Sequence, residues 1–215
     1  MFNEPGDKRS FPIKLFGYMR VLEQEDHLIP KTRKLQLKEL ADFISERKEK
    51  GKTPKIMVIC THNSRRSQMA QLWLKVAAAS YGIGKLRVFS GGTEATAFHP
   101  NAVAALKYAG LPLEQTTEGD NPFYECEIGN GGDVLVMFSK KYDDPRNPKK
   151  GFAAVMVCNE ADEACPVVVG AKARFSISYD DPKKFDGTPE EAAAYQERCR
   201  QIAREMFYVI RNAVE

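Results

Sequence analysis

The chain has 215 residues, 43% of them hydrophobic, and a formal net charge of +3. This is enough for one good hydrophobic core, whereas two complete domains would be cramped. No apolar run approaches the length of a membrane span, and the first ten residues contain no apolar segment like a signal peptide, so we expect no membrane partner. The five cysteines, an odd number, do not resemble a secreted disulfide framework and favour a reducing, cytoplasmic location.

The excess positive charge lies at the N-terminal end of the sequence. Residues 1–54 contain 12 basic and 9 acidic side chains, and residues 55–215 contain 20 of each. An anion bound by the second part must therefore be held by local loop geometry and not by the field of the whole protein. The mixed signs in the first part argue against an arm that binds nucleic acid.

The N-terminal part should contain one amphipathic helix. Residues 1–30 show no regular pattern, and we expect them to be irregular. Apolar side chains recur at helical spacing over residues 32–50, with Thr32 as N-cap and Gly51 as C-cap.

Residues 55–73 have the pattern of a strand, a tight loop and a helix in succession. Ile56–Ile59 is a short apolar run typical of a buried parallel strand, and a helical pattern begins at Ser67. The loop between them, CTHNSRRS, places a thiol at the end of a strand and the start of a helix. Backbone N–H groups and the positive end of the helix dipole converge there, which favours both a thiolate and a bound tetrahedral oxyanion. Arg66 can curl back to hold two oxygens of the anion, and Ser67 can donate its hydroxyl to the thiolate.

Strands and helices alternate through the rest of the chain. We expect strands at Leu86–Ser90, Asp133–Phe138 and Ala153–Val157, and helices at Ser67–Tyr81, Pro100–Ala109 and Pro189–Ala213. This order predicts an α/β fold with a doubly wound, mostly parallel four-stranded sheet flanked by helices, and chemistry at the C-terminal ends of the strands. We assign this catalytic domain to residues 55–215 and an N-terminal helical extension to residues 1–54. The charged segment Lys140–Gly151 should be a solvated surface loop.

Two cysteines follow the last predicted strand directly, in the segment CNEADEACP. The six residues between Cys158 and Cys165 are too many for a zinc ribbon or a thioredoxin-type pair. They suit a flexible loop in which the two thiols approach each other and the Cys60 loop. Spacing alone supports a second interpretation equally well: Cys158 is a buried residue at the end of a strand, and Cys165 has no role in the chemistry. The three histidines lack the spacing of metal ligands, so we expect no metal and no cofactor.

A candidate acid lies in the segment Tyr179-Asp180-Asp181-Pro182. Proline restricts the residue before it to an extended conformation, so Asp181 should be presented from a stiff loop. The alternative is an ordinary turn residue.

The CTHNSRRS loop resembles the Cys-x5-Arg-Ser signature of low-molecular-weight protein tyrosine phosphatases and of the thioredoxin-coupled arsenate reductases built on that fold. Its continuation, Gln-Met-Ala, is similar to the reductase branch. The family usually has Gly at the position of His62 and often a second Cys at the position of Arg65. His adopts positive φ more readily than most residues, so His62 is compatible with the loop. Both residues could narrow the mouth of the site or add an anion contact.

This resemblance implies roles for the residues singled out above. Cys60 would be the nucleophile, and Asp181, with Asp180 as the next candidate, would be the general acid. Arsenate or phosphate would be bound by the loop residues Thr61, His62, Asn63, Ser64, Arg65, Arg66 and Ser67. Cys158 and Cys165, the latter followed by Pro166, match the cysteine pair of the reductases. A disulfide would then pass from Cys60–Cys158 to Cys158–Cys165 and on to thioredoxin or a similar dithiol.

Three functions remain to be compared. The first is an arsenate reductase. The second is a protein tyrosine phosphatase, whose phosphocysteine is hydrolysed by water and which needs neither Cys158 nor Cys165. The third is an anion-sensing or scaffold protein in which His62 and Arg65 prevent turnover. Lysines 183 and 184 stand where the phosphatase branch often has aromatic residues that frame phosphotyrosine, which favours the reductase.

Overall fold

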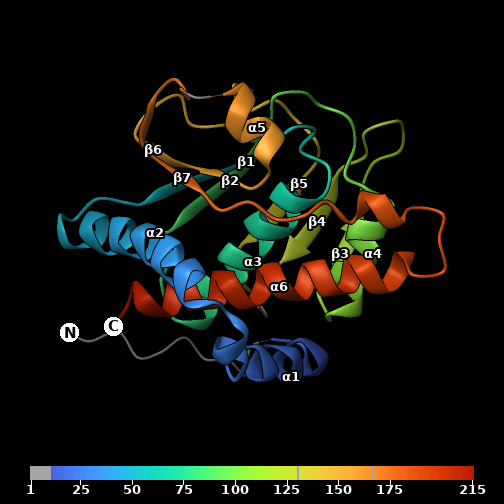
Figure 1. The fold of residues 1–215 in the computed structure, drawn as a ribbon, viewed down its shortest axis with the longest axis horizontal. Coiled ribbons are helices and arrows are strands. Elements are labelled where there is room, and N and C mark those ends of the chain that lie inside the picture. Colours follow the sequence, from blue (N-terminus) through green and yellow to red (C-terminus); the bar gives the residue numbers. More distant parts are fainter. Residues whose placement is uncertain (1–10, 130, 166) are drawn as a thin grey trace.

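The predicted α/β fold is confirmed, with a four-stranded parallel sheet flanked by helices (Figure 1). The computed structural model describes residues 11–129, 131–165 and 167–215. The strand order is β2-β1-β6-β7. These strands are β1 (Lys55–Cys60), β2 (Arg87–Gly92), β6 (Phe152–Met156) and β7 (Ala171–Ser176). Residues 56–60 are buried throughout, as the apolar run Ile56–Ile59 predicted for a buried parallel strand.

The register of the sheet brings two cysteines to the same edge. In the parallel pair of β1 and β6, Ile59 lies opposite Met156, and the Val157 N–H donates to the Ile59 carbonyl at 2.9 Å. Cys60 and Cys158 therefore lie side by side at the C-terminal ends of neighbouring strands.

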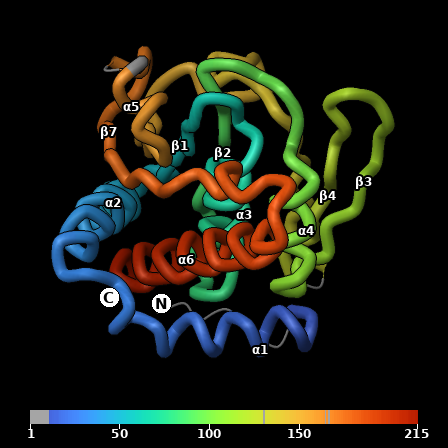
Figure 2. Tube along the Cα trace, turned by 45° about the vertical axis from the view of Figure 1, so that its right-hand side comes forward, coloured from blue at the N-terminus to red at the C-terminus, as the bar shows by residue number. Residues whose placement is uncertain are grey.

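Helices cover the sheet and each other. They are α3 (Arg66–Ser80), α4 (Pro100–Tyr108), α5 (Asn159–Ala164), α6 (Glu191–Asn212) and the 3-10 helix η3 (Pro182–Phe185). The three helices predicted in this part of the chain are α3, α4 and α6, with ends shifted by one or two residues. Helix α3 packs on β1 and β2, and the long α6 crosses against α3 and α4 (Figure 2).

One predicted strand belongs to a different sheet, and one strand of the parallel sheet was not predicted. The apolar segment Asp133–Phe138 does not join the parallel sheet but contributes β5 (Val134–Met137) to a separate antiparallel sheet. This second sheet has the order β3-β4-β5, with β3 at Leu113–Gln115 and β4 at Tyr124–Glu127. Val134 and Val136 are 55% and 42% exposed there, so the run is not the doubly covered strand that its composition indicated. The missing parallel strand is β7, an edge strand whose mixed composition gave no apolar run.

The segment Lys140–Gly151 is not simply a solvated loop. Lys140 and Asn147 are buried, and the Asn147 side chain donates to the Ser90 carbonyl at 3.0 Å. A Cβ at Gly91 would lie 2.4 Å from the Cα of Tyr142, so the segment packs directly on the end of β2. The charged composition concealed the few buried side chains that fix it.

The first 54 residues contain more structure than predicted. Helix α1 (Ile13–Leu22) and the 3-10 helix η2 (Glu25–Leu28) occupy a region expected to be irregular, whose first ten residues lie outside the described part. Helix α2 (Lys31–Glu49) has Lys50 as its C-cap residue, one position before the predicted Gly51. Gly51 follows with φ of 65°, and the Lys52 N–H donates to the Arg47 carbonyl. The N-cap residue of α2 is Pro30, so the prediction of Thr32 was wrong.

Both α1 and α2 lie against α6 (Figures 1 and 2). The buried apolar side chains of residues 11–44 belong to the same cluster as those of the parallel sheet and its helices. Trp73 on α3 is fully buried, stacks on Tyr18 of α1 at 5.6 Å between ring centroids, and meets Phe207 of α6 edge-on at 6.3 Å. The first described residues are therefore part of the packed core.

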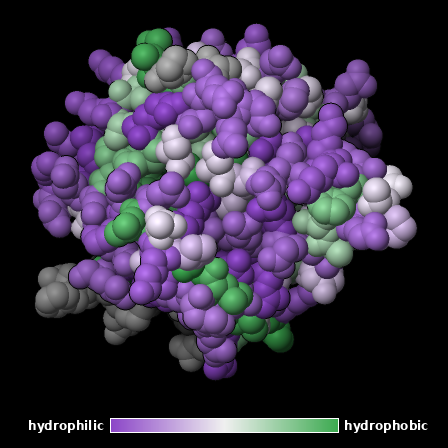
Figure 3. Space-filling model, viewed as in Figure 1, coloured by the Kyte–Doolittle hydropathy of each residue, from purple (hydrophilic) through white to green (hydrophobic). Residues whose placement is uncertain are grey.

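The outer surface is mainly hydrophilic on the face seen in Figure 3, with small apolar patches between the hydrophilic side chains. Among the described residues, no helix is long and apolar enough to cross a membrane.

Candidate active site

The Cys60 loop presents a row of backbone donors. Within the described residues, the backbone N–H groups of residues 62–67 donate no hydrogen bond to the protein. They precede or open α3, so the positive end of the helix dipole adds to them. The backbone passes so close to Gly92 that a Cβ there would lie 2.5 Å from the Thr61 carbonyl oxygen and 2.7 Å from the Asn63 nitrogen. The loop is thus built to hold a compact anion against a thiol.

Ser67 connects the thiol to the rest of the loop. Its Oγ lies 3.0 Å from the Cys60 Sγ and accepts a hydrogen bond from the Asn63 side-chain amide at 2.8 Å. Because the Ser67 oxygen accepts from Asn63, its own proton is available for the Cys60 sulfur. Both Ser67 and Asn63 are fully buried, so this pair is shielded from water.

The loop turns at Asn63 and not at His62. Asn63 is the only non-glycine residue with positive φ in the described chain, at 46°. Asn tolerates this conformation because its short polar side chain bonds locally. Its Oδ1 accepts from the Lys140 N–H at 3.0 Å, and Gln68 donates to its carbonyl at 3.0 Å. His62 instead points toward Glu94, with 3.5 Å between Nε2 and Oε2.

Arg66 joins the loop to the candidate acid. Its Nη2 donates to the Asp181 Oδ2 at 2.7 Å, and its Nη1 donates to the Tyr179 carbonyl at 2.8 Å. Asp181 also accepts from the Lys183 N–H at 3.0 Å, as the N-cap of η3. Asp180 points away and pairs with Arg198 at 3.3 Å. Of the two acids, only Asp181 therefore lies beside Arg66.

Arg65 lies in a network that sequence reasoning missed. Its Nε donates to the Tyr195 hydroxyl at 2.9 Å, and its Nη1 is 3.8 Å from the Asp181 Oδ2. The Tyr195 hydroxyl in turn donates to Asp186 at 2.8 Å, and its ring stacks on His99 at 5.5 Å. Burial and the Asp186 carboxylate raise the pKa of Tyr195 to about 12, so it remains protonated at neutral pH. The residues just before α3 and α4 meet Tyr195 of α6 here, and no spacing in the sequence links them.

Cys158 lies next to the anion loop. It is fully buried, and its Sγ is 3.5 Å from the Thr61 Oγ1. The Ala161 N–H donates to the same sulfur at 3.4 Å, which makes Cys158 the N-cap of α5. Burial raises the pKa of the Cys158 thiol, and a negative Cys60 nearby adds to this effect. The thiol is therefore mainly protonated at neutral pH.

Cys165 is separated from Cys158 by a helix and not by the flexible loop that we expected. Helix α5 runs between them, with Cys158 as its N-cap and Cys165 as its C-cap. At a rise of about 1.5 Å per residue, their Cα atoms lie roughly 10 Å apart. Pro166, the third residue of the predicted motif, lies outside the described residues.

The remaining thiols are distant structural residues. Cys126 lies on β4, and burial raises its pKa to about 12. Cys199 of α6 is fully buried and accepts from the Trp73 indole at 3.2 Å. All five cysteines are free thiols. Within the part of the chain that the structure describes, no three His, Cys, Asp or Glu side chains are grouped as metal ligands.

Known proteins are similar to this chain in sequence and in fold. Residues 55–143 match the family of low molecular weight phosphotyrosine protein phosphatases. The arsenate reductase of Bacillus subtilis (strain 168) is 31% identical over 145 residues, which cover 67% of this chain and 86% of that protein. The arsenate reductase of Bacillus licheniformis is 32% identical over 146 residues, with the same two coverages.

Solved structures agree on the fold. The low-molecular-weight phosphotyrosine phosphatase of Vibrio cholerae O395 gives a TM-score of 0.50 at 14% identity and covers 74% of this chain and 95% of that one. The low-molecular-weight protein tyrosine phosphatase of T. tengcongensis also gives 0.50, at 17% identity, and covers 74% and 98%.

Proposed function

The chain belongs to the low-molecular-weight phosphotyrosine protein phosphatase family, and from this premise we propose that it is an arsenate reductase with Cys60 as its nucleophile. One observation carries the proposal beyond the family: a second thiol, Cys158, is buried beside the anion loop, 3.5 Å from Thr61. A phosphatase has no use for a thiol in that place. The curated relatives at 31% and 32% identity are arsenate reductases, which supports the same assignment.

The first step uses the loop and the acid. The free N–H groups of residues 62–67 and the Arg66 guanidinium hold three oxygens of arsenate, and the Cys60 thiolate attacks the arsenic. A bond forms between sulfur and arsenic, and a hydroxyl group of the arsenate takes a proton from the protonated Asp181 and leaves as water. Ser67 stabilises the thiolate before the attack, from 3.0 Å.

The second step transfers two electrons to arsenic. The Cys158 sulfur loses its proton and attacks the Cys60 sulfur, so a disulfide forms while the electron pair of the sulfur–arsenic bond goes to the arsenic. Arsenate is thereby reduced to arsenite, which leaves the loop. Neighbouring strand ends place both thiols at this edge of the sheet before the reaction starts.

The third step needs a conformational change. Cys165 attacks Cys158, which frees Cys60 and leaves a Cys158–Cys165 disulfide. The Cα atoms of a disulfide are at most ~7 Å apart, whereas α5 holds these two roughly 10 Å apart, so α5 must unwind. We propose that thioredoxin or a similar dithiol then reduces this disulfide, in a cytoplasm that keeps the remaining thiols reduced.

The alternative function is a protein tyrosine phosphatase. It is favoured by the ion pair of Arg66 and Asp181, which is all that phosphocysteine chemistry needs beyond Cys60. A recess of about 320 Å³ beside the loop would have to take the phenol ring. It is lined by His62, Ser64, Arg65, Thr96, Ala97, His99, Pro100 and Lys183, without a Phe, Tyr or Trp. This polar lining is a poorer match to tyrosine than to a small inorganic anion.

The two functions are separated by assaying arsenate-dependent thiol oxidation and phosphotyrosine hydrolysis in parallel. Cys158→Ser and Cys165→Ser should each stop repeated arsenate turnover yet leave hydrolysis of a small aryl phosphate near the wild-type rate. Mass spectrometry of the Cys165→Ser protein after one turnover should show Cys60 joined to Cys158. Cys126→Ser is the matched control, since it removes a buried thiol far from the loop.

The reductase assignment fails if no such disulfide forms and the wild type hydrolyses phosphotyrosine without consuming thiols. The site would then be that of a protein tyrosine phosphatase.

A further inference from the structure

We infer that Arg33, in the N-terminal extension, is a positioning residue that holds the Asp181 segment in place for proton transfer. This inference rests on the proposed role of Asp181 as general acid. It gives the extension a part in the reaction, although the extension lies outside the family match.

Arg33 reaches the acid segment directly from the first turn of α2. Its Nη2 donates to the Ser178 carbonyl at 3.1 Å, and its guanidinium carbon lies 4.8 Å from the centre of the Tyr179 ring. Its Nε donates to Glu205 of α6 at 2.8 Å. One planar side chain thus ties three elements together: α2, α6 and the segment after β7.

Two arginines donate hydrogen bonds to adjacent backbone carbonyls of the same segment. Arg33 bonds the Ser178 carbonyl, and Arg66 bonds the Tyr179 carbonyl at 2.8 Å. Successive carbonyls of an extended chain point to opposite sides, so the two guanidinium groups hold it from opposite directions. The Tyr179 N–H donates to the Val157 carbonyl at 3.1 Å. This leaves the backbone two residues before Asp181 little freedom.

The Arg33 contact is buried and specific to arginine. The side chains of Arg33 and Glu205 are only 14% and 3% exposed. The Tyr179 hydroxyl lies near both and is buried, and burial together with the Glu205 charge raises its pKa well above the usual value. A lysine could keep the charge opposite Glu205, but a single ammonium cannot also bond the Ser178 carbonyl and stack on the ring.

The consequence concerns the leaving group. An acid that is displaced by a fraction of an ångström still binds Arg66 but transfers its proton poorly. Substrates whose leaving group needs a proton should then slow down, while substrates with a good leaving group should not. A purely structural role for Arg33 would affect both kinds of substrate alike.

The test compares two aryl phosphates, phenyl phosphate and 2,4-dinitrophenyl phosphate, on the full chain. Asp181→Asn should lower kcat for phenyl phosphate by ~10²–10⁴-fold and change kcat for the dinitrophenyl ester little. Arg33→Lys should lower kcat for phenyl phosphate by roughly 10-fold, and Arg33→Met by more, with KM unchanged and the dinitrophenyl ester within about twofold of wild type. If loss of the Glu205 partner prevents Arg33→Met from folding, Arg33→Lys alone decides the matter.

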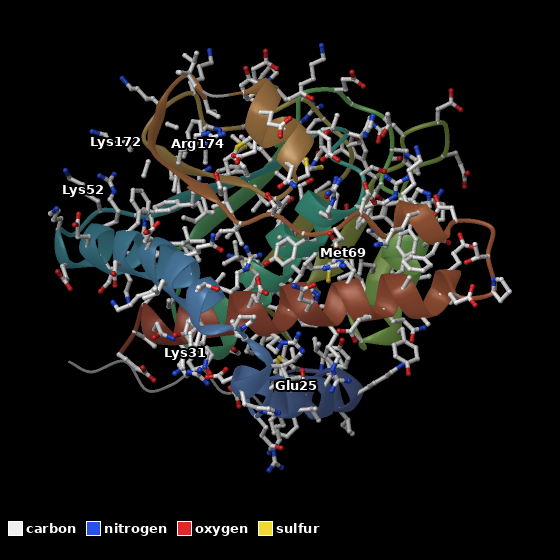
Figure 4. All side chains as sticks on the ribbon, viewed as in Figure 1. Glu25, Lys31, Lys52, Met69, Lys172 and Arg174 are labelled. Atoms are coloured by element: carbon white, nitrogen blue, oxygen red, sulfur yellow. The ribbon has the colours of Figure 1, made fainter. Side chains whose placement is uncertain are left out.

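Glu25→Gln is the matched control. Glu25 lies between α1 and α6 (Figure 4), where its carboxylate accepts from Arg204 at 3.0 Å and pairs with Arg200. It therefore joins the extension to α6 as Arg33 does but does not contact the acid segment. This variant should lower stability and leave the ratio of the two rates as in wild type.

The other possible results distinguish an error in the inference about Arg33 from an error in the proposed function. If Asp181→Asn changes the ratio and Arg33→Lys does not, the inference about Arg33 is wrong and the proposed function stands. If Glu25→Gln changes the ratio as Arg33→Lys does, general loosening of the extension explains the effect and the inference is again wrong. If Asp181→Asn leaves the ratio unchanged, or wild type hydrolyses neither ester, the proposed chemistry of the Cys60 loop is itself contradicted.

Discussion

The Cys60 loop and the Cys158–Cys165 segment lie at the same edge of the sheet but are prepared for reaction in opposite ways. The loop is fixed: Asn63 and Ser67 are buried and bonded to each other, and Gly92 leaves the backbone no room to shift. The second segment is a short helix that holds its two thiols apart. In the proposed mechanism, binding and attack are therefore preorganised, whereas the relay of the disulfide requires local unfolding.

The strongest test of the fixed region replaces its proposed nucleophile. Cys60→Ser should abolish arsenate reduction and aryl phosphate hydrolysis, by roughly 10⁴-fold or more, since a serine hydroxyl does not ionise at neutral pH. Steady-state rates of both reactions measure this. Retention of more than a few per cent of either activity would place the nucleophile elsewhere.

Arg66→Lys tests the geometry of the anion site. Activity should fall by ~10²–10³-fold, nearly as far as in Arg66→Ala, because an ammonium cannot bond two oxygens in one plane. Phosphate affinity, measured by calorimetry, should fall with it. If the Lys variant binds phosphate as the wild type does, the backbone donors alone hold the anion.

The second step should depend on pH in a way that the first does not. Burial raises the pKa of Cys158, and the thiolate is its reactive form, so the fraction that can attack increases as pH rises. The rate of arsenite release in a single turnover should therefore rise about 10-fold per pH unit between about pH 6 and 8. The control is the dinitrophenyl ester, whose hydrolysis does not use Cys158. A flat arsenite profile would show that proton loss from Cys158 does not limit the step.

Asn63 allows the fixed backbone and the hydrogen bond to Ser67 to be tested separately. Asn63→Ala should cost about 1–3 kcal/mol of unfolding free energy through strain at positive φ, and should lower activity by roughly 10-fold through loss of the bond to Ser67. Asn63→Gly removes the same bond without the strain, so it should be more stable than Asn63→Ala yet equally slow. Equal stability of the two variants would show that φ at this position carries no strain.

The smallest expected effect concerns the helix between the thiols. Glu163 is exposed on α5, and Glu163→Gly should weaken the helix by about 0.5–1 kcal/mol relative to Glu163→Ala. If unwinding limits the third step, formation of the Cys158–Cys165 disulfide should be ~2–5-fold faster in the Gly variant. Quenched-flow trapping of free thiols measures this rate. A Gly variant no faster than the Ala variant would mean that unwinding is not limiting.

The contrast between local and long-range signals explains which features the sequence could predict. Strand, loop and helix follow one another between Lys55 and Ser80, so the fold of the loop can be predicted from neighbouring residues. The apolar run at Val134 predicted a strand but could not identify its partners, because periodicity does not encode which sheet a strand joins. Helix α1 carried a readable signal, since Leu15, Met19 and Leu22 follow helical spacing, but Gly17 and neighbouring aromatic residues obscured it.

The side chains around the acid could not have been predicted in the same way. Arg65 is 130 positions from Tyr195, which lies near Asp186, and their contacts depend on how α6 packs on α3. The same holds for Arg33, which meets Ser178 across 145 positions of sequence. Even within the loop, the choice of Asn63 over His62 for positive φ depends on the bond from Lys140, which the sequence places far away.

The stacking of Trp73 on Tyr18 gives the protein a built-in optical reporter. Trp73 is the single tryptophan of the chain, and a ring from the extension covers one of its faces. Its indole also donates to the Cys199 sulfur at 3.2 Å. If α1 detached while the rest of the fold persisted, the indole would meet water, and its emission would shift to longer wavelength. Intrinsic fluorescence can therefore follow the docking of the extension in solution, without a label, during the same turnover that the thiol assays measure.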